Sequence, residues 1–261
     1  MGARSIAALN RLPDEEKHVI YAQFIPPELL ERFSLSSEYH DLLIQGLLKL
    51  KCKPGRTDVV LELRHELGFE DPLLYAHLTD TMNGQVHVLL YVVNDPHSVR
   101  FNVDKMPDGT PTEFGIFRRN VDAEIAAMNA GLAPGQVRQG LRMLNHSVEA
   151  FEKFVDYLGH EVYFIDPLSY HNAIVFERYG FQYQQGRRRM ERIHSGFSEG
   201  GEYFSLLDGS SPFRQPEYAQ SIRGRSWAIH DCILGEPFTD IIMYKTLGIH
   251  AGLNTFPAAK W

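Results

Sequence analysis

The chain has 261 residues and a net charge of −7 at neutral pH, with 44% hydrophobic and 23% charged residues. This composition is typical of a globular protein with a substantial core. The acidic balance argues against non-specific nucleic-acid binding, which depends on neutralising phosphates with basic side chains. The longest apolar run, Val86 to Val93, is far too short to span a bilayer. We therefore expect a globular protein that binds neither nucleic acid nor a membrane.

Cysteines and histidines give no sign of a disulfide framework or a metal centre. Cys52 and Cys232 stand alone, without a CxxC pair or metal-ligand spacing, so we expect a reducing, cytoplasmic environment. The twelve histidines form no HxH, HxxxH or HExxH pattern. No metal site is predicted from them.

The first hundred residues predict helices followed by a meander of strands. Residues 1–25 are weakly patterned and are expected to form an arm on the surface. Asn83-Gly84 is a tight-turn signal before a strand. The elements expected here are helices at Glu28–Phe33, His40–Lys51 and Thr57–Gly68, a new element from Asp71 to Leu78, a strand at Gln85–Val93 and an antiparallel return at Val99–Val103.

The middle of the chain predicts alternating helices and strands. A helix at Val121–Ala130 precedes a long amphipathic segment, Pro134–Leu158, with Pro134-Gly135 at its start and Gly159 as a left-handed cap. Apolar residues follow one face of this segment at steps of three and four, which is typical of a helix packed on a sheet. They are Val137, Leu141, Leu144, Val148, Phe151, Val155 and Leu158. A buried strand at Glu161–Asp166, a helix at Ser169–Tyr179 and a further strand after Gly180-Phe181 follow, which indicates an α/β arrangement.

The start of the long predicted helix combines two arginines with a glycine. Arg138, Gly140 and Arg142 fall in its first turn, where amides without intrahelical partners lie at the positive end of the helix dipole. Such a turn can bind phosphate. A plain helix start with solvated arginines is the alternative, and the turn by itself favours it.

Two segments resemble the GNAT superfamily of acyl-CoA N-acyltransferases. Asn172–Phe181 is similar to that family's helix ending in "YEKxGF", and Pro134–Leu144 is similar to its pyrophosphate-binding turn, "RxxGxG/A". The resemblance covers roughly residues 60–195. Four positions differ from the pattern: Val137 stands at the arginine, Arg142 at the second glycine, Phe176 at the tyrosine that usually protonates the departing thiolate, and Ser169 at the asparagine.

The resemblance implies a protein that uses acetyl-CoA or another acyl-CoA as a substrate and a small-molecule amine as the acceptor. We assign the base to His171, acting through water, and the acid to Tyr179. A homodimer is left open. The residues implied in binding the coenzyme are Val137, Arg138, Gln139, Gly140, Leu141 and Arg142 in the turn, and Ser169, Asn172 and Phe176 on the following helix.

The expected fold is mixed α/β, with a central mixed sheet flanked by helices. We expect an N-terminal arm and helices at 1–56, a GNAT-like core at 57–195 and a C-terminal extension at 196–261 packed on the core. Within this plan Arg187–Arg189 and Met190–Ile193 are expected to form a hairpin partner.

Two other functions stay open. Loss of the tyrosine at Phe176 suggests a GNAT-like protein that binds a ligand or partner without catalysis. Gly196–Gly200 matches GxSxG, so a serine hydrolase centred on Ser198 is the third hypothesis, with Asp231 or Asp240 and then His250 in the order of that fold. The motif requires a strand that turns sharply into a helix, whereas Glu202–Leu207 itself resembles a strand, which favours a chance match.

Overall fold

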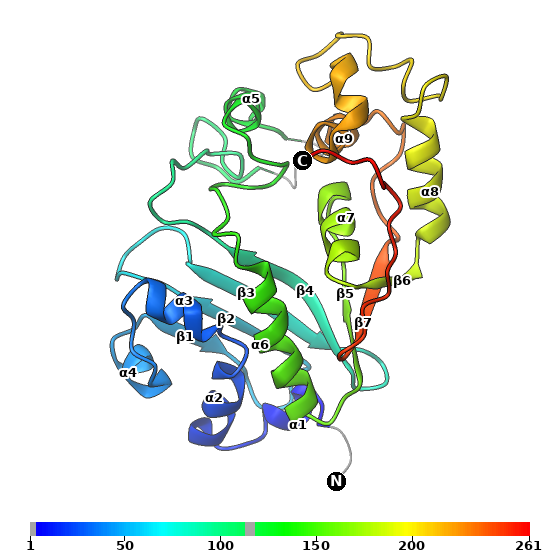
Figure 1. Cartoon of the computed structure of the whole chain (residues 1–261). Helices are drawn as coiled ribbons and strands as arrows, with labels where there is room; N and C mark the ends of the chain where they lie inside the picture. Colours follow the sequence, from blue (N-terminus) through cyan, green and yellow to red (C-terminus); the bar gives the residue numbers. More distant parts are fainter. Residues whose placement is uncertain (1–3, 113–117) are drawn as a thin grey trace. The chain divides into compact units, whose positions relative to one another are not determined.

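The structure is a computed structural model that describes residues 4–112 and 118–261. Figure 1 shows the whole chain with labels on its helices and strands. The chain forms two compact units. The first comprises residues 4–97, Gly140–Asp166 and Tyr244–His250, and the second comprises Ser98–Gln139, Pro167–Met243 and Ala251–Trp261. Each unit therefore combines segments that are far apart in the sequence.

The first unit holds most of a mixed sheet and the helices that cover it. Its helices are α1 (Ile6–Leu9), α2 (Asp14–Ala22), α3 (Pro27–Arg32), α4 (Tyr39–Ile44) and α6 (Leu144–Tyr157), and its strands are β1 (Leu48–Lys51), β2 (Asp58–Leu63), β3 (Leu74–Asp80), β4 (Val86–Val93) and β5 (Val162–Ile165). Strand β7 (Ile242–Thr246) has residues in both units. The strand order of the sheet is β1-β2-β3-β4-β5-β7-β6. The expected mixed α/β fold is confirmed.

Strand alternation gives the meander β1 to β4 one buried face. In the antiparallel register Leu61 lies opposite Ala76 and Leu63 lies opposite Leu74, and all four side chains are fully buried. The intervening Glu62 points to the other, partly exposed face. This period of two is the pattern of a strand with one face toward a core.

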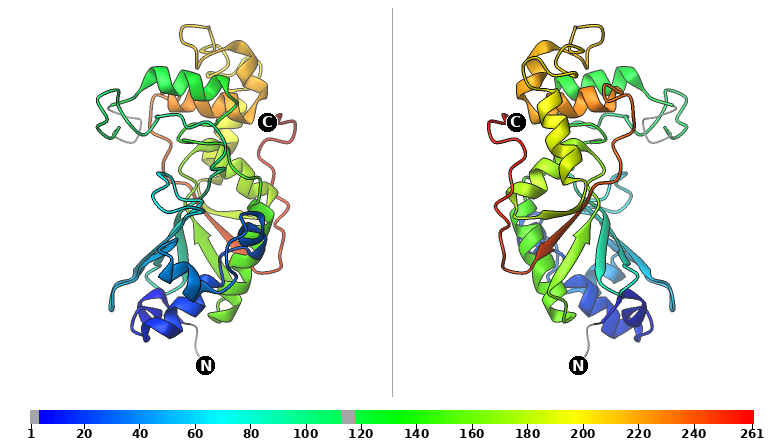
Figure 2. Two further views of the ribbon diagram at one scale, coloured as in Figure 1. Left: turned by 90° about the vertical axis from the view of Figure 1, so that its left-hand side faces the viewer. Right: turned by 90° about the vertical axis from the view of Figure 1, so that its right-hand side faces the viewer.

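Helix α6 covers that buried face with an aromatic cluster. Phe151 and Phe154 lie on its inner side and contact Phe24, which follows α2. Phe151 also contacts Tyr163 of β5 at a centroid distance of 5.0 Å. Figure 2 shows the whole chain in two further views, each turned by 90° from Figure 1. These aromatic rings, spaced along one face of α6, thus pack the helix against both the sheet and the N-terminal segment.

Strand β4 pairs with β5 only at its beginning. The parallel ladder joins His87 to Phe164 and Val88 to Ile165, whereas the pairing of β4 with β3 continues to Val93. Strand β5 ends at Ile165. The edge of β4 from 89 to 93 is therefore not covered by β5.

The second unit is mainly helical. Its elements are α5 (Val121–Asn129), α7 (Tyr170–Arg178), β6 (Gln182–Gln185), α8 (Arg187–Gly196), the 3-10 helix η1 (Pro216–Gln220) and α9 (Ile222–His230). Trp227 of α9 is the centre of one core, where it stacks on Phe213 and donates from Nε1 to the Leu132 carbonyl at 2.9 Å. The indole N–H is thereby satisfied inside the core.

Several predicted elements near the N-terminus are wrong. Residues 4–25 are not a surface arm, because α1 and α2 supply buried side chains such as Ile6 and Tyr21. The predicted helix at His40–Lys51 is the short α4 followed by β1, and the predicted helix at Thr57–Gly68 contains the strand β2. Val59 and Leu63 are four residues apart, a spacing that places them on one face of a helix and also on one face of a strand. The segment forms a strand because it pairs with β1 and β3.

The long helix begins ten residues later than predicted. Pro134–Met143 is irregular, and α6 starts at Leu144. Val137 packs with Val103, Ala127 and Leu132 in a core of the second unit, whereas Leu141 is buried in the first unit. Their helical spacing is therefore coincidental, since they belong to two cores.

Three more expectations concern the strands. Val99–Val103 does not form a strand, although Phe101 donates its amide to the Val137 carbonyl at 2.8 Å. The expected hairpin partner at 187–193 is the helix α8, and Glu202–Leu207 consists of turns. The tight turn at Asn83-Gly84 is confirmed, since it connects β3 to β4. Over the ranges that the structure describes, no helix has the length and apolar character needed to cross a membrane.

The aromatic cluster gives a stability prediction. Phe154 is fully buried and contacts Tyr21, Phe24 and Phe151. Phe154→Ala is expected to lower the free energy of unfolding by about 3–5 kcal/mol, because it removes a buried ring and leaves a cavity. Phe154→Leu is the matched control and should cost clearly less. Urea unfolding followed by circular dichroism measures both, and an equal effect of the two variants would contradict the proposed role of the ring.

Candidate functional site

The predicted coenzyme-binding turn lies where the chain passes from one unit to the other. Val137, Arg138 and Gln139 belong to the second unit, and Gly140 begins a segment of the first. The Gln139 amide donates to Ser98 Oγ at 3.2 Å, and the Arg138 guanidinium donates to the Ser98 carbonyl. These residues are not the first turn of a helix, so that part of the prediction is wrong. Their role in binding a coenzyme remains a prediction.

The first unit contains the actual start of α6. No side chain caps it, and the amides of its first turn have no intrahelical acceptor. Arg142 is exposed and has a left-handed backbone (φ 58°) two residues before the helix. Gly140 forms an isolated antiparallel bridge with Asn94, directly after β4. The uncapped amides and a cation thus lie in one short segment that is joined to the end of β4.

Gly140 lies beside the end of β4. A Cβ atom built on it would lie 3.5 Å from the Val93 carbonyl oxygen, which is ordinary van der Waals contact. A small side chain would therefore also fit at this position.

Tyr91 is a site residue that the sequence reasoning missed. It lies on the part of β4 that β5 does not cover, and its hydroxyl is buried without a hydrogen-bond partner. Burial raises the pKa of this phenol, and the nearby Ser147 hydroxyl of α6 opposes the rise. A buried donor without an acceptor costs stability. A strand tyrosine carries no sequence signal for this, because the surroundings of its hydroxyl depend on packing with α6.

Helix α3 approaches the start of α6 from another direction. Glu28 lies 3.3 Å from His146 Nδ1, and Arg32 donates to the Leu141 carbonyl at 3.4 Å. The start of α6 is therefore flanked by one carboxylate and two arginines, Arg32 and Arg142. An anion bound here would gain from the arginines and would compete with Glu28 for His146.

The structure brings two of the predicted residues of α7 together. His171 is buried, and its Nδ1 lies 3.0 Å from Ser169 Oγ and 2.9 Å from Ser226 Oγ of α9. Burial lowers the pKa of His171 to about 3, and the neighbouring His230 adds to the shift. The imidazole is thus neutral at pH 7. No sequence pattern indicated that these two serine hydroxyls would contact the same imidazole.

The remaining predicted residues of α7 are spread along the helix. Phe176 contacts Phe181 at a centroid distance of 5.2 Å, and Tyr179 is the C-terminal cap residue. Asn172, three residues into the helix, is half-buried. Tyr179 lies more than two turns from His171 along α7. Their joint role as acid and base remains a prediction.

The second unit has a cavity of about 290 Å³, partly open to solvent, beside the start of α7. Ser226, Ile229 and His230 lie on one face of α9, and Ser169 comes from the cap of α7. The other lining residues are Pro134, Leu168, Tyr170, Cys232, Gly235, Glu236, Pro237, Phe238 and Thr239. Most of the wall is apolar, and the two serines that contact His171 are among its few polar groups.

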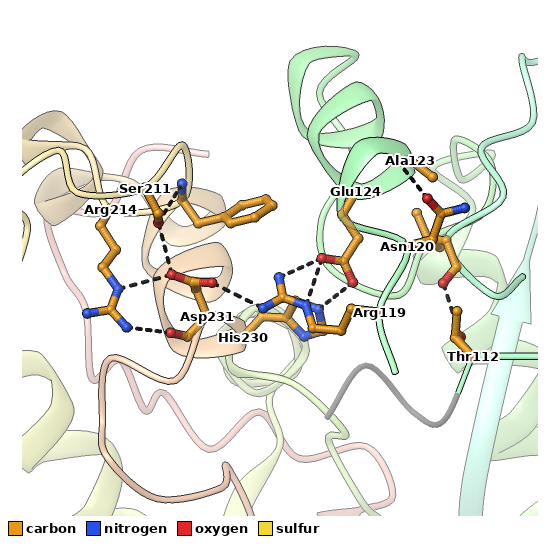
Figure 3. A network of polar contacts seen from close by, with 11 residues as sticks. Thr112, Arg119, Asn120, Ala123, Glu124, Ser211, Arg214, His230 and Asp231 are labelled. Carbon is orange, nitrogen blue, oxygen red and sulfur yellow. Dashed lines mark hydrogen bonds and ion pairs between the residues drawn. The ribbon is translucent and has the colours of Figure 1, made fainter. Parts of the chain in front are cut away.

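A network of charged groups holds His230 in place (Figure 3). Glu124 of α5 is 3% exposed and accepts from His230 Nε2 at 3.0 Å and from Arg119. Arg119 also donates to Asp231, which accepts from Arg214 as well. Burial raises the pKa of Glu124, but the hydrogen bonds from His230 and Arg119 outweigh it and leave this pKa lowered. Glu124 is therefore ionised, and His230 Nε2 is a donor.

The hydrolase motif has a structural explanation instead. Ser198 follows the helix α8 rather than a strand, and its hydroxyl donates to the His194 carbonyl at 3.0 Å. A Cβ atom on Gly196 would lie 2.3 Å from the Tyr203 ring, so glycine is needed for packing. The strand-to-helix turn that presents a nucleophile is missing here.

The chain matches no protein-family model, and no curated protein or solved structure is found to be significantly similar. In the part of the chain that the structure describes, no group of three or more His, Cys, Asp and Glu residues is arranged to hold a metal ion. The site is therefore argued from its own geometry.

The low pKa of His171 can be measured directly. Because its folded-state pKa is about 3, below the ordinary value of about 6.5, the folded protein disfavours protonation. The stability contributed by neutral His171 is complete above pH 6.5 and is lost as the pH falls toward 3. In NMR spectra of ¹³C-labelled histidines, the His171 signal, assigned with His171→Gln, should not titrate between pH 8 and pH 5. A midpoint near 6.5 would contradict the buried geometry.

Proposed function

We propose that this protein is an N-acyltransferase that takes the acyl group from a coenzyme A thioester and transfers it to an amine. The observation that carries the proposal is the short pairing of β4 with β5, which leaves the edge of β4 uncovered as far as Val93. Gly140 joins that edge directly to the segment that starts α6. The resemblance to the GNAT superfamily implies a coenzyme bound at this kind of junction.

The diphosphate would bind at the start of α6 rather than at the turn predicted from the sequence. The uncapped amides from Leu144 to His146 lie at the positive end of the helix dipole. Arg142 is exposed within two residues of them and can neutralise phosphate charge. Of the six turn residues predicted from the sequence to bind the coenzyme, this site would use Gly140, Leu141 and Arg142. It would not require residues 137–139.

Tyr91 is a second candidate for the acid. Its hydroxyl is buried beside the Ser147 hydroxyl of α6, and its proton could be donated to a thiolate or a thioester carbonyl. Tyr179 was chosen from the sequence because Phe176 replaces the usual tyrosine, and it is retained as the alternative acid. His171, a residue of the second unit, stays the sequence-based choice for a base that acts through water.

A non-catalytic ligand-binding protein is the second candidate function. Phe176 cannot donate a proton, and its ring contacts Phe181. In that case coenzyme A would still bind at α6, but no thiol would be released when an amine is added. The amine acceptor, and with it the small-molecule partner, belongs only to the enzymatic proposal.

Arg142 tests the binding site. Arg142→Ala is expected to weaken coenzyme A binding by about threefold to tenfold, because it removes one charge-assisted contact with phosphate. Arg11→Ala, an exposed arginine of the same unit, should leave the affinity unchanged. Isothermal titration with coenzyme A and acetyl-CoA measures both. Absence of binding at millimolar concentration, or equal affinity in both variants, would rule out this site.

Tyr91→Phe separates catalysis from stability. The variant removes a buried hydroxyl that has no partner, so the free energy of unfolding should stay equal or rise by up to about 1 kcal/mol. Amine-dependent thiol release from acetyl-CoA should fall by about tenfold to a hundredfold if the hydroxyl is the acid. Tyr179→Phe is the matched comparison. An unchanged rate in Tyr91→Phe together with a reduced rate in Tyr179→Phe would return the role to Tyr179.

A further inference from the structure

The cavity of the second unit has features of a ligand site that the acyl-transfer proposal does not use. It lies beside the start of α7 and the inner face of α9, and all of its lining residues belong to the second unit. Its volume of about 290 Å³ is at the lower end of the range for small-molecule sites. A ligand that fills it is therefore small.

At least one serine hydroxyl in this cavity has a proton free for a ligand. Ser169 Oγ and Ser226 Oγ both contact Nδ1 of His171, at 3.0 and 2.9 Å. Ser169 Oγ also lies 3.4 Å from Nε2 of the same ring. A neutral imidazole has only one acceptor nitrogen, whichever of the two it is, so the ring can accept from only one hydroxyl. Neither Oγ has an acceptor other than the His171 ring in the described part of the chain. The second hydroxyl therefore lacks a protein acceptor.

The start of α7 adds positive potential to the same wall. Ser169 is its N-terminal cap residue, yet the hydroxyl makes no capping hydrogen bond because it contacts His171. The amides of Tyr170 and His171 are consequently without a side-chain acceptor at the positive end of the helix dipole. Ser169 and Tyr170 line the cavity. The wall thus offers hydroxyl donors and unpaired amides to an anion.

The charges around the cavity limit the anion to a weakly charged one. Among the described residues, no Lys or Arg lines the cavity, so no cationic side chain of the lining would balance the charge of a phosphate dianion. Glu236 is the acidic residue of the lining, and it forms ion pairs with Arg189 and Arg192. His230 contributes an imidazole whose Nε2 is occupied by Glu124. A single carboxylate fits this balance better than phosphate.

The rest of the wall is apolar and suits a hydrocarbon body. Leu168, Ile229 and Phe238 line the cavity, together with Pro134 and Pro237. Burying apolar ligand surface against such side chains is the main source of affinity in small pockets. The hydroxyls and amides then orient the polar end.

We propose that the cavity binds a small organic monocarboxylate, with the carboxylate at Ser169, Ser226 and the start of α7 and the apolar body against Ile229 and Phe238. The site is a second one, separate from the coenzyme site proposed at α6. It rests only on the geometry of the second unit, and its test is independent of acyl transfer.

Cys232 provides a reporter for occupancy. This thiol is exposed and lines the cavity, whereas Cys52 is buried. Alkylation of the full chain by N-ethylmaleimide, followed by mass spectrometry, should therefore modify Cys232 first, and Cys232→Ser should lack the fast reaction. Benzoate and hexanoate are expected to slow this reaction in a saturable way. Benzamide and benzylamine, which match benzoate in size, should protect at least about tenfold less well because they lack the charge of the carboxylate.

Variants of the two serines test the head-group site. Ser169→Ala and Ser226→Ala should each weaken benzoate protection by about threefold to tenfold, the effect of one hydrogen bond. Ser205→Ala, an exposed serine outside the cavity that donates to a carbonyl of its own turn, should leave it unchanged. Thr239→Trp, at an exposed position of the lining, should abolish protection by filling the cavity. Thermal unfolding of each variant confirms that it is folded.

Several results would overturn the proposal. Absence of protection by any carboxylate at millimolar concentration contradicts a binding site. Equal protection by benzamide and benzylamine contradicts recognition of the charged end. Unchanged protection in Ser169→Ala, the half-buried serine of the pair, contradicts the placement of that end even if Ser226→Ala does not fold. Arg142→Ala should not alter benzoate protection, so failure of the coenzyme proposal is distinguishable from failure of this one.

Discussion

The short parallel pairing of β4 with β5 is the constraint on which the first unit's candidate site depends. A central strand normally has partners along both edges, because unpaired amides and carbonyls in a sheet are costly. Strand β4 satisfies one edge along its whole length through β3, but the other edge pairs with β5 only at His87 and Val88. The backbone near Gly140 then meets the end of β4 through a single bridge to Asn94. The proposed coenzyme site rests on this combination of a strand edge that β5 does not pair and a helix start without a side-chain cap.

The sequence predicted the order of elements in the middle of the chain better than the elements near the N-terminus. The helix α5, the strand β5 and the helix α7 each carry a strong local signal, with apolar spacing and glycine or proline at the ends. Strand β2 carried no such signal, because Val59 and Leu63 fit either period and its partners come from other segments. Tertiary pairing overrides local propensity in such a segment. The prediction of a helix at residues 134–143 was wrong for a different reason, because Val137 and Leu141 are buried in separate cores.

Candidate site residues could be predicted only where the residue type and its position in the sequence indicate a chemical role. His171 was named from its place at a helix start and Ser169 from its position in the GNAT pattern, and the structure brings them together. Ser226, 55 residues further on, contacts the same imidazole at 2.9 Å, and no spacing rule connects it to α7. The buried hydroxyl of Tyr91 is equally inaccessible to sequence reasoning, because its surroundings depend on packing with α6. Partners made by packing between distant segments are the part that one sequence without relatives does not reveal.

The second unit contains two charged side chains that are almost completely buried. Glu177 is 1% exposed and accepts from Tyr183 and Thr255, and Arg225 is also 1% exposed with its guanidinium 3.6 Å from the centre of the Phe256 ring. Burial lowers the pKa of Arg225, whose guanidinium donates to the Ala219 carbonyl. Charges held this way are expensive to desolvate, and replacing them with apolar residues often does not reduce stability. Their cost is compensated if they fix the positions of α7 and α9, since these two helices carry Ser169, His171 and Ser226. A cavity whose polar wall is fixed before a ligand arrives needs less ordering on binding, and this preorganisation is the physical reason to regard the space beside α9 as a site rather than a packing defect.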